Sequence, residues 1–286
     1  MKRTLFVFLI LVVCVPLWAQ KASAGKASQR PKVALVLGGG GAKGAATVGV
    51  LKYVEASGVP IDMVVGTSIG SIVGGLYSLG YTSQQLDSLF RTQSWVNMFM
   101  GSLMGDSIVG TLRTLTAANM AGDGGQHLDF DDLPIPFRCV AVDAKKMQEV
   151  VLKEGDLAMA MRASMAIPLV FKPVKIGDMR LVDGGVLNNL PVDVARAMGA
   201  DMVIAVDLTV NKHDDGLSPL ASLLRPDLKK YQQNRQQVDV YINPNLKGYG
   251  AQDFSPAKIE EMIALGEKAG KSSLKDLKKL KKKLKN

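Results

Sequence analysis

The chain has 286 residues, of which 47% are hydrophobic and 21% charged, and these values exclude a disordered polar chain. Its 29 glycines follow no three-residue period, which excludes a collagen-like sequence. The net charge of +9 comes from the two ends, because residues 1–19 carry +2 and residues 271–286 carry +7, leaving residues 20–270 neutral. A neutral body gives no support for a nucleic-acid-binding face, so we expect no nucleic-acid partner.

The first nineteen residues are typical of a secretory signal peptide. Two basic residues precede an uncharged apolar run over residues 5–15, and small residues follow it. This run is shorter than the roughly 20 residues of a transmembrane helix, although an uncleaved anchor stays an alternative. We expect cleavage after Ala19 or Ala24 and export to the periplasm or the medium. Only Cys139 would remain, which excludes an internal disulfide.

The apolar runs of the body predict strands that alternate with helices. Strands are predicted over residues 33–37, 61–65, 138–142, 150–152, 173–176, 180–182 and 202–206, and helices over 45–57, 69–79 and 191–198. Because the longer strands are continuously apolar, we expect an α/β fold whose sheet is largely parallel and covered on both faces. We expect residues 31–245 to form this domain.

Residues 94–126 differ from the rest, since they are rich in Met, Gly, Ser and Thr and hold Trp95 close to several apolar side chains. One interpretation is a pair of helices that packs on the core, because apolar residues at helical spacing are usually buried. The other is a mobile apolar cap over an active site, since long insertions in compact domains are often lids. The sequence leaves both open.

A glycine-rich loop joins the first predicted strand to the first predicted helix, where residues 38–44 read GGGGAKG. Glycines at this junction let the backbone aim its N–H groups at a phosphate or a developing oxyanion. The spacing also fits a dinucleotide fingerprint, but Glu55 and Asp62 both miss the end of the second strand, where the acidic residue is needed. A P-loop is excluded because Lys43 is followed by Gly44 rather than by Ser or Thr.

Ser68 stands in the motif Gly66-Thr67-Ser68-Ile69-Gly70, between the second predicted strand and a predicted helix. In this context G-x-S-x-G indicates a strained turn that exposes a serine hydroxyl at the carboxyl edge of the sheet. The alternative is that Ser68 merely caps the helix.

A serine nucleophile needs a base, and the chain offers two kinds. His127 and His213 lie in polar or charged loops, which is typical of ordinary exposed histidines. Asp183 follows a predicted strand and precedes Gly184 and Gly185, so its carboxylate can approach a neighbouring hydroxyl. By itself this Asp-Gly pair is also a strong turn signal.

Taken together, these motifs resemble those of the patatin-like phospholipase family, in a bacterial and exported form. The segments that carry the resemblance, over about residues 31–207, are Gly39-Gly40-Gly41-Ala42-Lys43-Gly44, Gly66-Thr67-Ser68-Ile69-Gly70, Asp183-Gly184-Gly185 and the stretches 162–168, 188–192 and 199–206. The resemblance implies a patatin-type three-layer fold with a mostly parallel central sheet. It also implies an enzyme that hydrolyses acyl esters of lipids, with a phospholipid or another lipid ester as its partner and no metal or cofactor.

The same resemblance implies roles for individual residues. Carried over by position, Ser68 is the nucleophile and Asp183 the proton acceptor of a dyad without histidine. The backbone N–H groups of Gly39, Gly40 and Gly41 are expected to form the oxyanion hole, with Lys43 beside it, where the family often has Arg. The other motif glycines are Gly44, Gly66, Gly70, Gly184 and Gly185.

Two alternatives to a hydrolase stay open on the sequence. An acyltransferase would pass the same acyl group from Ser68 to an alcohol or an amine, and no residue separates the acceptors. A non-catalytic lipid-binding module would keep the fold but would not need both Ser68 and Asp183, so the presence of both favours catalysis.

Residues 246–286 are expected to form a helical, lysine-rich tail. Leu274, Leu277, Leu280 and Leu284 lie three or four residues apart, so they fall on one stripe of a helix whose other positions are mostly lysine. One interpretation is a solvated, frayed terminus. The other is a basic amphipathic helix that lies on an anionic membrane and holds the enzyme beside its substrate.

Overall fold

The structure is a computed structural model that describes residues 30–95, 107–120, 127–209 and 227–284. The predicted signal peptide lies outside these residues, as do His213 and residues 96–106 and 121–126 of the methionine-rich segment. Every strand and helix predicted between residues 33 and 206 by its residue range is present, with its ends within two residues of the prediction, whereas the helix of the predicted tail begins only at Pro256.

Eight strands form the main sheet: β1 (Val33–Leu37), β2 (Met63–Thr67), β4 (Phe137–Asp143), β5 (Gln148–Leu152), β7 (Val174–Ile176), β8 (Met179–Asp183), β9 (Met202–Val206) and β10 (Val240–Ile242). The helices are α1 (Gly44–Ser57), α2 (Ile69–Ser78), α3 (Ser83–Thr92), α5 (Ser107–Ala118), α6 (Leu157–Ser164), α7 (Val192–Ala197), α9 (Leu228–Gln236) and α10 (Pro256–Lys283). Two 3₁₀ turns, η1 (Gly41–Lys43) and η2 (Gly184–Val186), follow β1 and β8, and β3 (Leu128–Asp129) pairs with β6 (Glu154–Gly155) in a small second sheet.

The main sheet has the order β10-β9-β1-β2-β4-β8-β7, with β5 also paired to β4. The five strands from β10 to β4 are mutually parallel, whereas β5, β7 and β8 join by antiparallel pairing. The expectation of a mostly parallel sheet is therefore confirmed, with an antiparallel extension at one side. In parallel pairing the carboxyl ends of neighbouring strands reach one edge of the sheet, and this edge is where functional loops gather.

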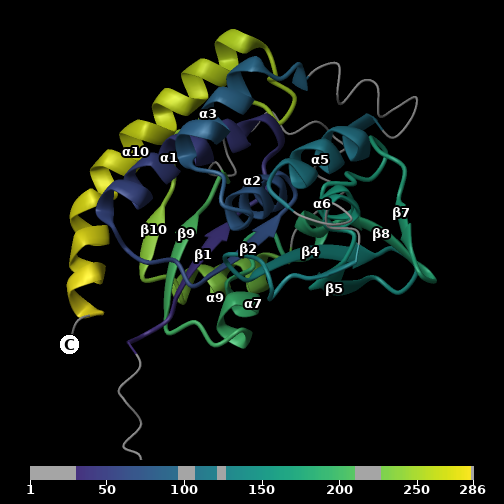
Figure 1. The fold of residues 1–286 in the computed structure, drawn as a ribbon, viewed down its shortest axis with the longest axis horizontal. Helices are drawn as coiled ribbons and strands as arrows, with labels where there is room; N and C mark the ends of the chain where they lie inside the picture. Colours follow the sequence, from purple (N-terminus) through teal and green to yellow (C-terminus); the bar gives the residue numbers. More distant parts are fainter. Residues whose placement is uncertain (1–29, 96–106, 121–126, 210–226, 285–286) are drawn as a thin grey trace, which may run out of the picture.

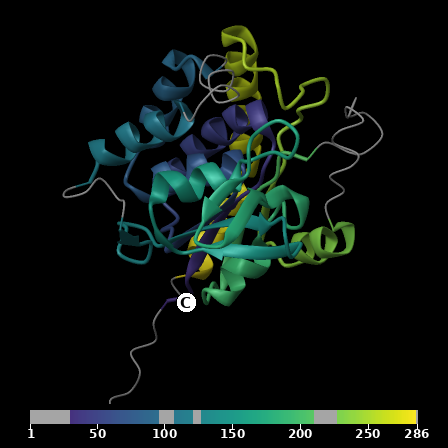
Figure 2. The same cartoon turned by 90° about the vertical axis from the view of Figure 1, so that its right-hand side faces the viewer.

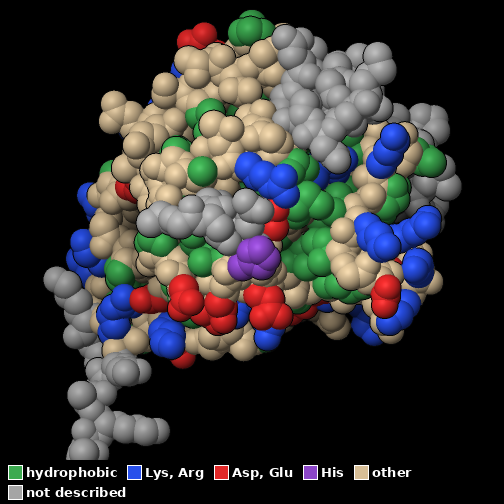
Figure 3. All heavy atoms as spheres, turned by 45° about the vertical axis from the view of Figure 1, so that its right-hand side comes forward, with side chains coloured by type: hydrophobic (Ala, Val, Ile, Leu, Met, Phe, Trp, Pro, Cys, Tyr) green, Lys and Arg blue, Asp and Glu red, His purple; other side chains and the backbone are tan. Residues whose placement is uncertain are grey.

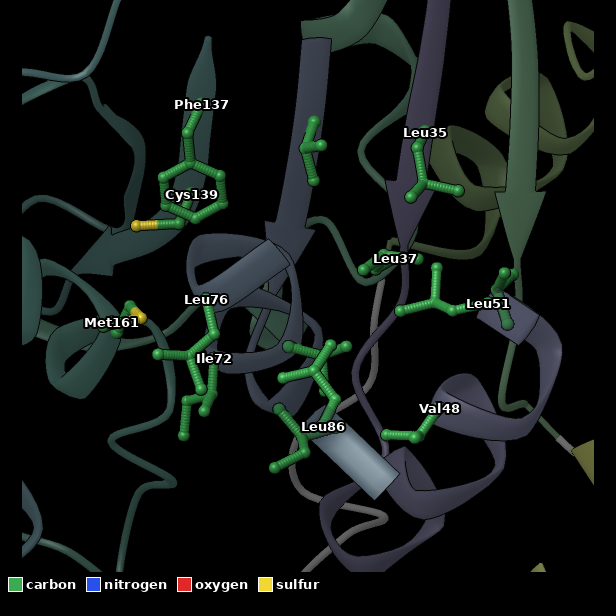
Figure 4. Packing of buried hydrophobic residues seen from close by; sticks show 14 of the residues in the cluster. Leu35, Leu37, Val48, Leu51, Ile72, Leu76, Leu86, Phe137, Cys139 and Met161 are labelled. Atoms are coloured by element: carbon green, nitrogen blue, oxygen red, sulfur yellow. The ribbon is translucent and has the colours of Figure 1, made fainter. Parts of the chain in front are cut away.

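Helices cover both faces of the sheet, which makes three layers (Figures 1 and 2). Helices α1, α2, α3, α5, α6 and α10 contribute to the larger apolar cluster, and α7 and α9 to the smaller one on the other face. Figure 4 shows Leu35 and Leu37 of β1 facing helical side chains such as Val48 and Leu51 in the larger cluster. Because both faces of the sheet are covered, every residue of β1 and β2 is buried, and Thr67 is the one polar residue among them.

The methionine-rich segment contributes to this core where the structure describes it. Trp95 is buried, stacks on Phe90 at 4.4 Å between ring centroids and donates from Nε1 to the Phe90 carbonyl. Helix α5 buries Ile108 and Leu112 in the larger cluster and contacts α6. These parts agree with the core interpretation, while the rest of the segment lies outside the described residues.

The C-terminal helix α10 packs along α1, and this contact corrects the expectation for the tail. The tail is helical, but Leu277, Leu280 and Leu284 are buried in the protein's own core. Its leucine stripe is therefore not available to enter a membrane, and the expected membrane-lying amphipathic face is wrong. The physical reason is that the apolar face of α1 and the sheet offer the stripe a partner within the chain.

The lysine-rich end of α10 also lies away from the carboxyl edge of the sheet. Its residues Lys279 and Lys283 line a shallow groove with Met202 and Val240, which are the first residues of β9 and β10. Figure 1 shows the C-terminus near the start of β1. At about 1.5 Å per residue, the 28-residue helix is long enough to run from one edge of the sheet to the other. Among the helices of the described residues, none is long and apolar enough to cross a membrane.

The α1–α10 contact depends on small residues, which gives a stability prediction. An added methyl at Gly266 would lie 1.9 Å from the Ala46 carbonyl oxygen, a backbone atom that cannot rotate away. We expect Gly266→Ala to lower the free energy of unfolding by about 1–3 kcal/mol through overpacking, despite alanine's better helix propensity. Urea unfolding measures the change.

The matched control is Gly110→Ala in α5, where an added methyl meets no atom within 4 Å. This variant should be stabilised by about 0.5–1 kcal/mol, because alanine replaces glycine in a helix without a clash. Equal effects of the two substitutions would contradict close packing of α1 on α10.

Candidate active site

Three strands bring the two motif residues Ser68 and Asp183 together. Residues Cys139–Asp143 of β4 form hydrogen bonds with β5 on one side of the strand. Strands β2 and β8 therefore both pair with β4 on its other side. Strand β2 runs parallel to β4 and ends with Thr67 opposite Val140, whereas β8 runs antiparallel and ends with Asp183 opposite Ala141. The two strands thus meet end to end at adjacent positions of β4, which places Ser68 beside Asp183 although 115 residues separate them.

Ser68 occupies a sharp turn between β2 and α2, as the motif predicts. Its backbone has φ 55° and ψ −127°, a conformation that is strained for a residue with a side chain. The flanking glycines make room for the turn, since a methyl on Gly66 would lie 2.4 Å from the Gly70 carbonyl oxygen. A methyl on Gly70 would lie 2.2 Å from the Leu37 carbonyl oxygen of β1. The alternative of a simple helix cap is wrong, because the Ser68 side chain makes no capping hydrogen bond to α2.

The Ser68 hydroxyl instead donates to Oδ2 of Asp183 at 2.6 Å. Both side chains are buried, with 5% of Ser68 and 6% of Asp183 exposed. The other carboxylate oxygen, Oδ1, accepts the Gly185 N–H at 2.7 Å, so Asp183 also forms the turn that its Asp-Gly pair suggests. One oxygen orients the carboxylate while the other faces the serine.

Burial changes the acidity of this carboxyl group. Desolvation raises the pKa of Asp183 from its ordinary 3.8 to about 6, and the hydrogen bonds from Ser68 and Gly185 partly oppose this rise. A carboxylate with this pKa is a stronger base than an exposed aspartate and is still ionised at neutral pH.

The glycine loop lies against the nucleophile. A methyl on Gly39 would lie 3.0 Å from Ser68 Cβ and 2.4 Å from Asn189 Oδ1, so only glycine fits there. The Gly39 N–H donates to the Asn189 carbonyl at 3.3 Å. Among the hydrogen bonds of the described residues, none is donated by the Gly40 or Gly41 N–H. Of the three expected oxyanion donors, Gly39 therefore already has a partner, and the other two have none among the described residues.

The remaining motif residues act mainly by letting chain segments approach closely. A methyl on Gly44 would lie 2.3 Å from Ile69 Cγ1, and one on Gly184 would lie 2.2 Å from the Val140 carbonyl oxygen. Gly185 has the same role, because a methyl there would lie 2.8 Å from Asn189 Oδ1. Lys43 ends η1 next to the loop and is partly buried.

Three polar residues, of which Ser164 and Asn188 are buried, support the site and were given no role by the sequence analysis. Ser164 accepts the Ser68 N–H at 2.9 Å and donates to the Val140 carbonyl at 2.6 Å, which fixes the turn on β4. The Asn188 carbonyl accepts from Thr67 Oγ1 at 2.9 Å, and Asn189 contacts Gly39. Their signal in the sequence was their place in segments 162–168 and 188–192, which pointed to the family but not to a contact.

Among the described residues, the hydroxyl of Ser68 has Asp183 as its partner and not His127. His127 is exposed in the loop before β3, and His213 lies outside the described residues. The hydroxyl of Ser68 is engaged with Asp183, so the site pairs a serine with a carboxylate.

A model of the patatin-like phospholipase family matches residues 35–196, which include Ser68, Asp183 and the glycine loop. The chain belongs to the patatin-like phospholipase family. This patatin-like chain is 32% identical over 290 residues to mouse patatin-like phospholipase domain-containing protein 6, covering 84% of the chain and 20% of that protein. It is 35% identical over 186 residues to an NTE family protein of Mycobacterium tuberculosis, covering 64% of the chain and 51% of that protein.

The patatin-like chain thus spans about a fifth of the length of the first of these relatives. Two solved structures have a similar fold. VipD of Legionella pneumophila superimposes with a TM-score of 0.55 at 14% identity, covering 86% of this chain and 67% of VipD. ExoU of Pseudomonas aeruginosa, in its complex with SpcU, gives 0.53 at 17% identity, covering 91% of this chain and 53% of that one. These likenesses show the α/β fold alone.

Proposed function

We propose that this protein is a lipid acyl hydrolase, phospholipase A-like, that cleaves carboxylic esters through Ser68 and Asp183. The observation that carries the proposal is the 2.6 Å hydrogen bond from the Ser68 hydroxyl to a buried carboxylate. Membership of the patatin-like phospholipase family supports a lipid ester as the substrate class.

In the proposed reaction, Asp183 takes the Ser68 proton as Oγ attacks the carbonyl carbon. The carbonyl electrons move onto the oxygen, which the N–H groups of Gly40 and Gly41 stabilise by about 3 kcal/mol each in comparable sites. The intermediate collapses, the ester C–O bond breaks, and the leaving alcohol receives the proton from Asp183. Water, activated by the same carboxylate, then releases the acyl group from Ser68.

The reaction requires the ionised form of Asp183, which gives a pH prediction. Because the pKa of Asp183 is raised to about 6, the rate should increase as pH rises through 6 and level off above about 7. We expect about a tenfold increase in kcat/KM, which reports the free enzyme, between pH 5 and pH 8 with an uncharged ester such as p-nitrophenyl butyrate. A rate that is flat over this range would contradict the raised pKa of Asp183.

A direct test of the function uses the full chain and a fluorophosphonate, which reacts with activated serines. Labelling of Ser68, located by mass spectrometry, together with turnover of a soluble ester, supports the proposal. A folded protein that neither reacts nor turns over any acyl ester would overturn it.

We further propose that residues 1–19 direct export and are removed after Ala19 or Ala24, on the support of their basic, apolar and small-residue order. Sequencing the N-terminus of protein recovered from outside the cytoplasm tests this. An unprocessed N-terminus on cytoplasmic protein would contradict it.

A further inference from the structure

Only three non-glycine residues among those described have a positive φ: Ser68, Met147 and Leu169. The first is the proposed nucleophile. The other two are also the most exposed large hydrophobic side chains of the described part, Leu169 at 79% and Met147 at 57%. A strained backbone and an exposed apolar side chain both cost free energy, and no contact among the described residues offsets this cost. The combination points to a partner outside the molecule.

Both residues lie on the side of the sheet that carries the site. The Ala166 carbonyl accepts the Asp183 N–H at 3.0 Å, and Leu169 follows three residues later, within about 11 Å of Ala166 along the chain. Met147 closes the turn between β4 and β5, beyond the carboxyl end of β4. Lys145 Nζ in that turn donates to the Asp178 carbonyl in the β7–β8 turn, so the two turns project together.

Five cations lie close in the sequence to the two apolar side chains. Lys145 and Lys146 precede Met147, and Lys172, Lys175 and Arg180 follow Leu169. Figure 3 shows Lys and Arg side chains gathered at one side of the face it presents, beside hydrophobic atoms. Residues 144–147 and 166–180 contain one acidic residue, Asp178. No ion pair among the described residues joins any of the five cations to a carboxylate.

Two of these cations are placed unfavourably for the isolated protein. Lys175 and Arg180 are directly opposite each other in the antiparallel pair of β7 and β8. Side chains at opposed positions project from the same face, so the like charges repel. An anionic partner would relieve this repulsion.

We propose that Leu169, Met147 and the five cations form a docking surface for an anionic lipid bilayer. The proposal rests on the proposed function, since it supplies the surface from which a lipid ester would reach Ser68. Cations match the charge of anionic headgroups, and exposed apolar side chains match the boundary of the acyl chains. An acidic protein would need only the cations, so the two apolar side chains favour the bilayer.

The test measures flotation of the full chain carrying Ser68→Ala, so that no lipid is consumed, with vesicles of equal parts phosphatidylglycerol and phosphatidylcholine. Adding Leu169→Gly and Met147→Gly should lower the partition coefficient about tenfold. Glycine is the residue that positive φ favours, so these substitutions should not lower the unfolding temperature. Lys172→Gln with Lys175→Gln should weaken binding at 0.1 M salt and have little further effect at 1 M, where charges are screened within about 3 Å.

Matched controls come from the other side of the molecule. Leu228→Ala removes another exposed leucine, 39% exposed in α9, and Lys278→Gln with Lys282→Gln removes two exposed lysines of α10. Both should bind vesicles within about twofold of the parent protein. Three results would each overturn the docking surface. The parent protein could fail to bind the vesicles, the glycine variants could bind as well as the parent, or the α10 variant could lose as much binding as the glycine variants.

The outcome separates the surface from the proposed function. Hydrolysis of a soluble ester by the unsubstituted chain tests Ser68 and Asp183 without a membrane. If vesicle binding depends on Leu169 but no ester is cleaved, the docking surface holds and the hydrolase proposal fails. If the ester is cleaved and binding is independent of Leu169, the docking surface alone is wrong.

Discussion

Replacing Ser68 with alanine is expected to lower ester hydrolysis by at least about 10⁴-fold while the protein stays folded. The substitution removes the attacking oxygen, and a water molecule in its place would not form the acyl-enzyme. The Ser68 N–H still reaches Ser164, so the turn keeps its anchor on β4. The rate is measured with p-nitrophenyl butyrate, and circular dichroism and thermal unfolding report the fold.

Serine and histidine controls make this result specific. Ser78→Ala removes another buried hydroxyl from the same helix, one that has no hydrogen-bond partner among the described residues, and should keep most activity. His127→Ala and His213→Ala should do the same. A large loss of activity in either histidine variant would indicate that a histidine is the base. Near-normal turnover by folded Ser68→Ala would show that Ser68 is not the nucleophile.

Asp183→Asn should cause a loss of about 10²–10⁴-fold, the range that a general base contributes. The amide has the shape of the carboxylate, so Oδ1 can still accept the Gly185 N–H, and the other end can donate to Ser68 Oγ. What disappears is the capacity to take the Ser68 proton. The double variant Ser68→Ala/Asp183→Asn should be no slower than Ser68→Ala, because the two groups act as a unit.

The same substitution should stabilise the fold at alkaline pH. Asp183 has a folded-state pKa of about 6 against 3.8 in the exposed group, so the folded protein holds this proton more tightly. The stability that this group contributes is present below pH 3.8 and is lost as pH rises through 6. At pH 8 the buried charge costs on the order of 3 kcal/mol, which Asn avoids, so the variant should unfold at a higher temperature.

Asp143→Asn is the matched control, since Asp143 is also buried, lies at the end of β4 and accepts only backbone N–H groups. It should keep most ester hydrolysis. If Asp183→Asn were folded and nearly as active as Asp143→Asn, another group would have to be the base.

Much of the site could be predicted from the sequence, because its chemistry depends on local backbone conformation. Gly66 and Gly70 frame Ser68 at a strand-to-helix junction, where G-x-S-x-G forces the strained turn that the structure has. The glycine loop could be predicted equally well, but the sequence did not show which of its N–H groups already donate a hydrogen bond. That the Gly39 N–H is bonded to the Asn189 carbonyl depends on a segment 150 residues away.

The supporting contacts were not predictable for a similar reason. Ser164 and Asn188 look like ordinary polar residues until Val140 and Thr67 are placed beside them. Helices α3, α6 and α9 were not predicted. Helix α6 is short and almost entirely apolar and α9 buries only Asn234, so neither shows a clear helical period, whereas α3 had a sequence signal in its Thr82–Gln85 capping box.

The sequence by itself determined the alternation of apolar strands and helices, the strained serine turn and the family, since each depends on residues close together in the chain. The family resemblance pointed to Asp183, but only the tertiary structure explains why this carboxylate faces Ser68, because β2 and β8 end at adjacent residues of β4. It also decided the tail. A leucine stripe requires an apolar partner, but the sequence does not show which surface that partner is. Here it is the protein's own core, against which α10 packs along α1.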